Sequence, residues 1–120
     1  MEPGTQVVWT NRAGKRFLKF VFNGHFSEEQ AIPAIASWKK EFSQNMSPGQ
    51  KTNIIWDCLN MTGFDPKVKS KWQEVLKEQS GYIDDIWIIS KNPIIRLAAT
   101  TMGMLTKYRI KAVNSESDIS

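Results

Sequence analysis

The sequence of 120 residues contains one cysteine and one histidine, Cys58 and His25, and these two could form a nucleophile–base pair. Asp57 and Asp65 could act as a carboxylate pair in acid–base chemistry. Each residue also has a structural explanation, which we weigh more heavily. A cysteine beside a buried strand usually packs as a small hydrophobic residue, while Asp57 suits hydrogen bonds to loop amides and Asp65 suits a helix cap. Because no third group that would orient His25 is evident, the sequence favours a non-catalytic protein.

A catalytic role for Cys58 remains an alternative. The thiol would need an electropositive neighbour, such as Lys67 or His25, to become a thiolate at neutral pH. A hydrolase or transferase of this kind predicts rapid labelling of the native protein by a thiol reagent.

The composition argues against several other classes of protein. A single cysteine allows neither an internal disulfide nor a cysteine-cluster metal site, and we expect no metal and no cofactor. The net charge of +4 is small and the basic residues are spread along the chain, so a nucleic-acid partner is not expected. No apolar run reaches the roughly 20 residues that cross a bilayer, and the start lacks the pattern of a signal peptide. We therefore expect a cytoplasmic protein without a transmembrane segment.

Apolar periodicity predicts the elements that position these side chains. Strands are predicted at residues 7–10, 16–22, 53–58, 86–89 and 108–113, with the first two joined as an antiparallel hairpin. Helices are predicted after start signals at Ser27, Asp65 and Asn92. The inward-facing residues would include Ile32, Ile35 and Phe42 in the first helix and Ile94, Leu97, Ala98, Met102 and Leu105 in the last. Pro33 indicates that the first helix either begins later or is bent.

This order of elements predicts an α/β fold, with an N-terminal β-hairpin followed by alternating helices and strands. The sheet would have four to five strands, mostly parallel, with helices packed on it. We assign residues 1–113 to a single domain and residues 114–120 to a polar tail that frays.

The loops after parallel strands meet at one end of such a sheet. We therefore predict a crevice for a ligand or partner there, formed by His25, Ser27, Asp57, Cys58, Thr62, Asp65, Ser90 and Asn92. The three helix starts at this end would favour a small anion.

Residues 57–65 (D-C-L-N-M-T-G-F-D) resemble the signature of STAS domains, in which an apolar strand leads through a short polar loop to an aspartate at a helix start. With residues 20–28 (F-V-F-N-G-H-F-S-E), they are more similar to the SpoIIAA-like branch of small bacterial cytoplasmic proteins. The resemblance implies a STAS-type fold that binds a protein partner or an apolar ligand. In phosphorylatable antagonists a serine follows the aspartate, but Pro66 and Lys67 follow Asp65 here, so that phospho-switch is not expected. A displaced phosphosite would have to be Thr62 or Ser70.

Five tryptophans and five methionines are many for this length. Trp38, Trp72 and Trp87 fit the core, whereas the helix with Met102, Met104 and Leu105 cannot bury all its apolar side chains. An exposed patch there would indicate a partner, a dimer or a lipid-facing surface.

Two hypotheses for function follow. The first is a non-catalytic cytoplasmic module that binds a protein partner or itself, as a homodimer. The alternative is a protein that binds a lipid or another apolar ligand. It arises because the SpoIIAA-like branch is similar in architecture to lipid-transfer domains of the CRAL-TRIO type, in which helices open over the sheet. The helix over residues 94–105 would then be the mobile wall.

Overall fold

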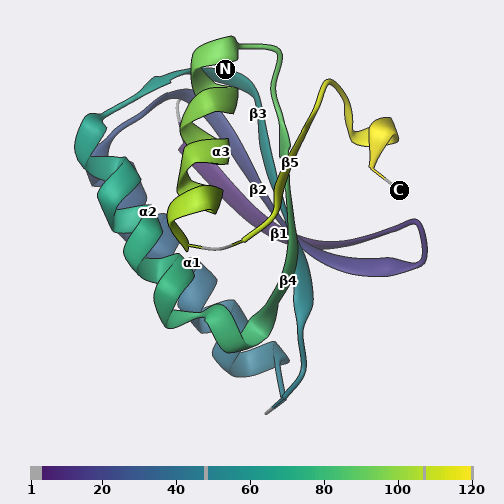
Figure 1. The fold of residues 1–120 in the computed structure, drawn as a ribbon. Helices are drawn as coiled ribbons and strands as arrows, with labels where there is room; N and C mark the ends of the chain where they lie inside the picture. Colours follow the sequence, from purple (N-terminus) through teal and green to yellow (C-terminus); the bar gives the residue numbers. More distant parts are fainter. Residues whose placement is uncertain (1–3, 48, 107, 120) are drawn as a thin grey trace.

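The first two strands form the expected hairpin in the computed structural model, which describes residues 4–47, 49–106 and 108–119 (Figure 1). β1 (Gly4–Arg12) pairs antiparallel with β2 (Lys15–Phe26) along its whole length. The two residues between them, Ala13 and Gly14, have positive φ angles of 54° and 75°. Two successive left-handed residues give a turn whose twist matches that of the flanking strands.

Three helices alternate with three further strands. The chain continues through α1 (Glu28–Asn45), β3 (Thr52–Phe64), α2 (Pro66–Glu78), β4 (Ile83–Ile89), α3 (Pro93–Thr106) and β5 (Ile110–Val113). β3, β4 and β5 each pair parallel with the preceding strand, so the sheet order is β1-β2-β3-β4-β5. The predicted α/β fold is confirmed, with five strands. α1 begins at Glu28 and runs through Pro33, so the later start that Pro33 suggested is wrong.

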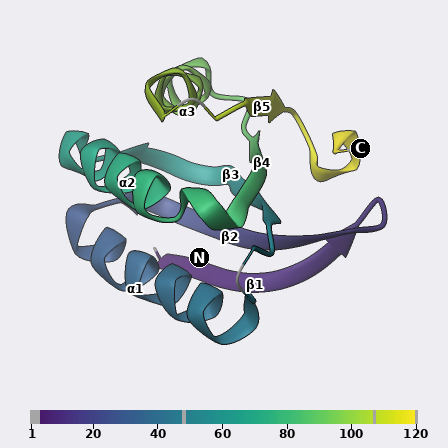
Figure 2. The same cartoon turned by 60° about the horizontal axis from the view of Figure 1, so that its bottom comes forward.

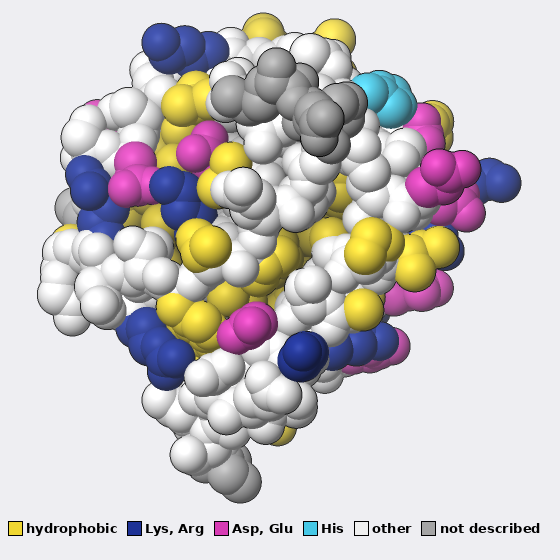
Figure 3. All heavy atoms as spheres, turned by 180° about the vertical axis from the view of Figure 1, so that it is seen from behind, with side chains coloured by type: hydrophobic (Ala, Val, Ile, Leu, Met, Phe, Trp, Pro, Cys, Tyr) yellow, Lys and Arg dark blue, Asp and Glu magenta, His cyan; other side chains and the backbone are white. Residues whose placement is uncertain are grey.

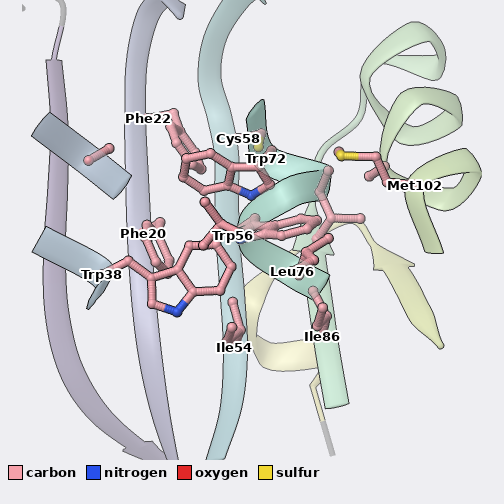
Figure 4. Packing of buried hydrophobic residues seen from close by; sticks show 14 of the residues in the cluster. Phe20, Phe22, Trp38, Ile54, Trp56, Cys58, Trp72, Leu76, Ile86 and Met102 are labelled. Atoms are coloured by element: carbon pink, nitrogen blue, oxygen red, sulfur yellow. The ribbon is translucent and has the colours of Figure 1, made fainter. Parts of the chain in front are cut away.

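All three helices cover the same face of the sheet (Figure 2). From β2 onward, each new strand is added on the same side of the preceding one. Because the crossover connections are right-handed, their helices all lie on one face of the sheet. The main core fills the space between this face and the helices. Trp72 of α2 lies at the centre of an aromatic cluster (Figure 4). Its ring centroid is 5.3 to 6.1 Å from the ring centroids of Phe20, Phe22, Phe26, Trp38 and Trp56.

The inward face of α1 is as predicted at Trp38 and Phe42 but differs by one residue in the first half of the helix. α1 buries Ala31, Ala34, Trp38 and Phe42, whereas Ile32 is 60% exposed. The assignment of Ile32 to the core is therefore wrong, because the small residues Ala31 and Ala34 allow the helix to lie close to the sheet.

The opposite face of the sheet carries a second, smaller apolar cluster. Residues 114–119, which we call the strap, follow β5 and pack on this face through Ile119, which is 4% exposed. Within the strap, Glu116–Asp118 form a single 3₁₀ turn that begins at Ser115. The expectation that this segment frays is wrong for the described residues 114–119, because an isoleucine within it is buried against the sheet.

Candidate functional site

β2 and β3 extend well beyond the other strands, and this changes the predicted crevice. Residues 59–64, expected to be a loop, belong to β3 and pair with the end of β2, from Asn60 opposite Asn23 to Phe64 opposite Phe26. Register shifts near Val21 and Gly24 absorb unpaired residues, as β-bulges do. The loop prediction is therefore wrong, because strand pairing outweighs the loop-like composition of this segment.

Asp65 joins the far ends of these two strands to the first turn of α1. Its Oδ1 lies 2.7 Å from Nε2 of His25, and its Oδ2 accepts a hydrogen bond from the backbone N–H of Glu28 at 3.0 Å. The Asp65 N–H donates to the carbonyl of Phe26. The imidazole of His25 is exposed and visible from behind in Figure 3.

This arrangement corrects the predicted role of Asp65. Asp65 precedes α2, but its carboxylate makes no capping hydrogen bond to α2. It instead binds the amino terminus of α1, where Ser27 Oγ also accepts from the N–H of Gln30 at 3.3 Å. The hydrogen bond with His25 and, secondarily, that from the Glu28 N–H lower the pKa of the Asp65 carboxyl. The carboxylate therefore fastens α1 to the strand that precedes α2.

Ser90 and Asn92 do not lie in the same crevice as this group. Asp57 is the partner of Ile89 across the sheet, so Ser90 lies near the level of Asp57. Asp65 is eight residues further along β3 and its extension, roughly 25 Å at about 3.3 Å per residue. Asn92 caps α3 as predicted, since its Oδ1 accepts from the N–H of Ile94 at 2.9 Å. Ser90 is buried and accepts from the N–H of Asn92.

Asp57 and Cys58 face opposite sides of the sheet, as neighbours on a strand must. Asp57 accepts from the N–H of Leu59 and lies 3.8 Å from Nζ of Lys19 on the strap side. Cys58 is buried among the helices, and burial raises the pKa of its thiol, with the charge of Asp57 adding to the effect. Within the described chain, no hydrogen bond joins Cys58 to His25, and Thr62 is exposed on β3.

The eight predicted residues therefore divide into separate groups. His25, Ser27 and Asp65 come together, Ser90 and Asn92 form the start of α3, and Cys58 lies on the opposite face from Asp57. Among the described residues, no group of three or more His, Cys, Asp or Glu side chains is placed to hold a metal ion.

Cys58 instead lines an apolar pocket between the far half of the sheet, α2 and α3. The pocket has a volume of about 60 Å³. Its walls are Phe22, Phe26, Trp56, Cys58, Met61, Phe64, Val68, Lys69, Trp72, Ile88, Ile95, Ala98, Ala99 and Met102. Lys69 is the one charged residue in this wall. From the sequence, only the apolar residues of α3 indicated that a pocket could form here. Met61 and Phe64, which form part of its wall, were assigned to a loop.

α3 also presents an apolar surface to solvent. Ile94, Leu97 and Met104 are 72%, 68% and 82% exposed, and we call these three residues the α3 stripe. The inward residues are Ile95, Ala99 and Met102, so the assignment of Ile94 and Leu97 to the core is wrong. Leu105 lies outside the residues whose side chains the structure describes. No helix in the described ranges combines the length and apolarity needed to span a bilayer.

Comparison with known proteins places this architecture among SpoIIAA-like folds. No family model matches the chain, and no curated protein matches it. A solved structure of an uncharacterized protein of the DUF3478 family from Shewanella loihica PV-4, with a SpoIIAA-like fold, superposes with a TM-score of 0.78 at 12% identity, covering 98% of this chain and 92% of that one.

The anti-sigma factor antagonist SpoIIAA, solved in its unphosphorylated form, is also similar. It superposes with a TM-score of 0.60 at 11% identity, over 96% of this chain and 92% of SpoIIAA. The chain therefore has a SpoIIAA-like fold, which confirms the fold that the residues around Asp57 and Asp65 implied.

Proposed function

We propose that this chain is a non-catalytic binding module that associates with a second copy of itself or another protein through α3. The observation that carries the proposal is the α3 stripe. Ile94, Leu97 and Met104 lie at helical spacing on one side of α3, and all three are more than two-thirds exposed. Single exposed apolar residues are common, but three large ones aligned on one helix form a patch that association would remove from water.

A second copy is the simplest occupant of this surface. Two α3 helices related by a two-fold axis would bring each stripe against its counterpart, which is the self-complementary arrangement of most dimers. The buried thiol of Cys58, the separation of Cys58 from His25, and Pro66 and Lys67 after Asp65 all support binding over catalysis or a phospho-switch.

Size-exclusion chromatography with light scattering tests self-association. Wild-type protein should show a concentration-dependent dimer, and Leu97→Lys should be monomeric because the dimer would bury its charge unpaired. Ile32→Lys is the matched control, since it places the same charge on an exposed isoleucine of α1. A wild-type monomer at high concentration contradicts the homodimer, and a dimer that survives Leu97→Lys contradicts the role of the stripe.

The apolar pocket favours a second candidate function, the binding of an apolar ligand. A volume of about 60 Å³ is less than half that of the engineered cavity of about 150 Å³ that holds benzene. A lipid chain would therefore enter only if α3 moved outward, taking Ile95, Ala99 and Met102 with it.

Native mass spectrometry of protein purified from cells tests this second function. A bound lipid should appear as added mass in wild-type protein and be lost in Ala98→Phe, which fills the pocket from its half-buried α3 wall. The Ile32→Lys protein should retain the ligand. A wild-type spectrum that shows only the mass of the chain contradicts lipid binding.

A further inference from the structure

The strap lies on a surface of the sheet that has two chemically distinct parts. The first is an apolar hollow, formed by the side chains of Phe17, Ile55, Trp87 and Ile89, into which Ile119 packs. The second is a basic edge next to this hollow. It is formed by Arg12 on β1 and Lys19 on β2. Lys111, on β5 at the other edge of the sheet, lies with its Nζ 4.6 Å above the ring of Trp87. These recognition groups all belong to the strands of the sheet.

Two residues of the strap match the two parts of this surface. The carboxylate of Glu116 lies 2.5 Å from Nζ of Lys19 and 3.6 Å from Nη1 of Arg12. The Nε–H of Arg12 also donates to the Glu116 carbonyl at 2.6 Å. Three residues later, Ile119 fills the hollow. Side chains three residues apart align in a 3₁₀ turn, so one turn presents the carboxylate and the aliphatic side chain to the same face.

The basic edge does not depend on the strap for its position. Nζ of Lys19 lies 3.8 Å from Oδ2 of Asp57, which in turn accepts from the N–H of Leu59. Lys19 therefore keeps an acidic partner when Glu116 moves away. The apolar residues of the hollow are likewise held by paired strands, since Phe17, Ile55 and Trp87 follow one another across β2, β3 and β4.

The strap itself is fastened only locally. Its described contacts with the sheet are one buried aliphatic side chain, the hydrogen bond from Arg12 Nε–H to the Glu116 carbonyl, and ion pairs whose side chains are 21% to 33% exposed. Segments with few buried contacts open at much lower free energy than the core, so the strap can leave while the sheet stays folded.

We infer that this face of the sheet is a peptide-recognition surface, which the strap occupies as a built-in competitor. The segment that it fits comes from a protein partner and has an acidic residue followed three positions later by an aliphatic residue, in a single turn. The positive charge of Arg12 and Lys19 complements the acidic residue, and the hollow accepts the aliphatic one. This surface is distinct from the α3 stripe, which lies on the helix side.

Binding of a synthetic peptide with the sequence of residues 114–120 tests the inference. The full-length variant E116K/I119N keeps the chain intact but removes both strap contacts. It should bind the peptide at least about tenfold more tightly than wild-type protein does, because a tethered competitor acts at a millimolar effective concentration. A peptide that carries the same two changes should bind neither protein. The control E29K/I32N makes identical changes at the same spacing on exposed residues of α1 and should behave as wild type.

Equal affinity of wild type and E116K/I119N for the peptide, or no binding to E116K/I119N that remains folded by circular dichroism, overturns the inference. If E116K/I119N does not fold, the milder variant E116Q/I119A takes its place. Hydrogen exchange of wild-type protein gives an independent readout. Excess peptide should speed exchange of the Asp118 and Ile119 amides, which donate within the strap turn, and unchanged exchange in the presence of bound peptide contradicts displacement of the strap.

Discussion

Gly103 is the residue at which α3 comes closest to the chain leading into β5, and replacing it with alanine tests how tightly this helix is held. A Cβ atom at this position would lie 2.8 Å from the carbonyl oxygen of Tyr108 and 3.0 Å from Cγ1 of Ile110. Two effects of Gly103→Ala oppose each other. Alanine favours a helix over glycine by about 1 kcal/mol, whereas overpacking a well-packed site costs about 1–3 kcal/mol.

The structure decides which effect is larger. The closest obstacle is a backbone carbonyl, which cannot rotate away as a side chain can, so α3 or the chain before β5 must shift. We expect a net loss of about 1–2 kcal/mol in the free energy of unfolding, taking the upper part of the overpacking range less the helix term. Gly81→Ala is the matched control, because a Cβ at Gly81 meets nothing within 4 Å.

Urea denaturation followed by tryptophan fluorescence measures both variants. The midpoint of Gly103→Ala should fall, while that of Gly81→Ala should stay the same or rise by the equivalent of about 0.4–1 kcal/mol, because alanine restricts the unfolded chain. A Gly103→Ala protein as stable as wild type would refute the close approach of α3. It would equally weaken the description of the apolar pocket, whose wall includes the neighbouring Met102.

Three further predictions concern the core, the α1 attachment and the thiol. Trp72→Ala should lower the free energy of unfolding by about 3–5 kcal/mol in urea denaturation, and Trp72→Phe should lower it less because one ring remains in the cluster; equal losses would contradict the central position of Trp72. The pKa of Asp65 is lowered in the folded state, so its carboxylate stabilises the fold above about pH 4 and this contribution is lost as the pH falls through the folded pKa. Between roughly pH 5 and pH 2, wild type should therefore lose more stability than Asp65→Asn, and parallel losses would argue against the hydrogen bonds with His25 and Glu28. Cys58, buried and with its pKa raised, should react slowly with a thiol reagent at neutral pH and quickly in urea; fast reaction of the native protein would revive the catalytic alternative.

The sequence predicted the element types well, because their signals are local. The alternation of short apolar strands with capped helices, and the caps at Ser27 and Asn92, depend on residues close together in the chain. The inward faces of α1 and α3 were harder to predict. Both helices carry apolar residues on more than one side, so periodicity alone did not distinguish Ile94 from Ile95 or Ile32 from Ala31.

The parts of the candidate site that were missed depend on contacts distant in sequence. Residues 59–64, which include Asn60, Thr62 and Gly63, resemble a loop until β2 is seen to extend beside them. Asp65 has the local signature of a cap for α2. Its carboxylate instead binds His25 and the N–H of Glu28, which lie 40 and 37 residues away in the sequence. The strap looks like a fraying tail because its one apolar residue gains a partner only after the sheet exists.

The sequential strand order also determines how the molecule can be assembled during synthesis. Each strand pairs with the strand made immediately before it, so the emerging chain can add strands one at a time to an existing edge. No later strand has to be inserted between two strands that are already paired, so each pairing closes only a short loop. The strap is different, because its hollow needs Phe17 from β2, Ile55 from β3 and Trp87 from β4. Ile119 can therefore dock only after β2, β3 and β4 have paired, so its burial reports the assembly of the middle of the sheet.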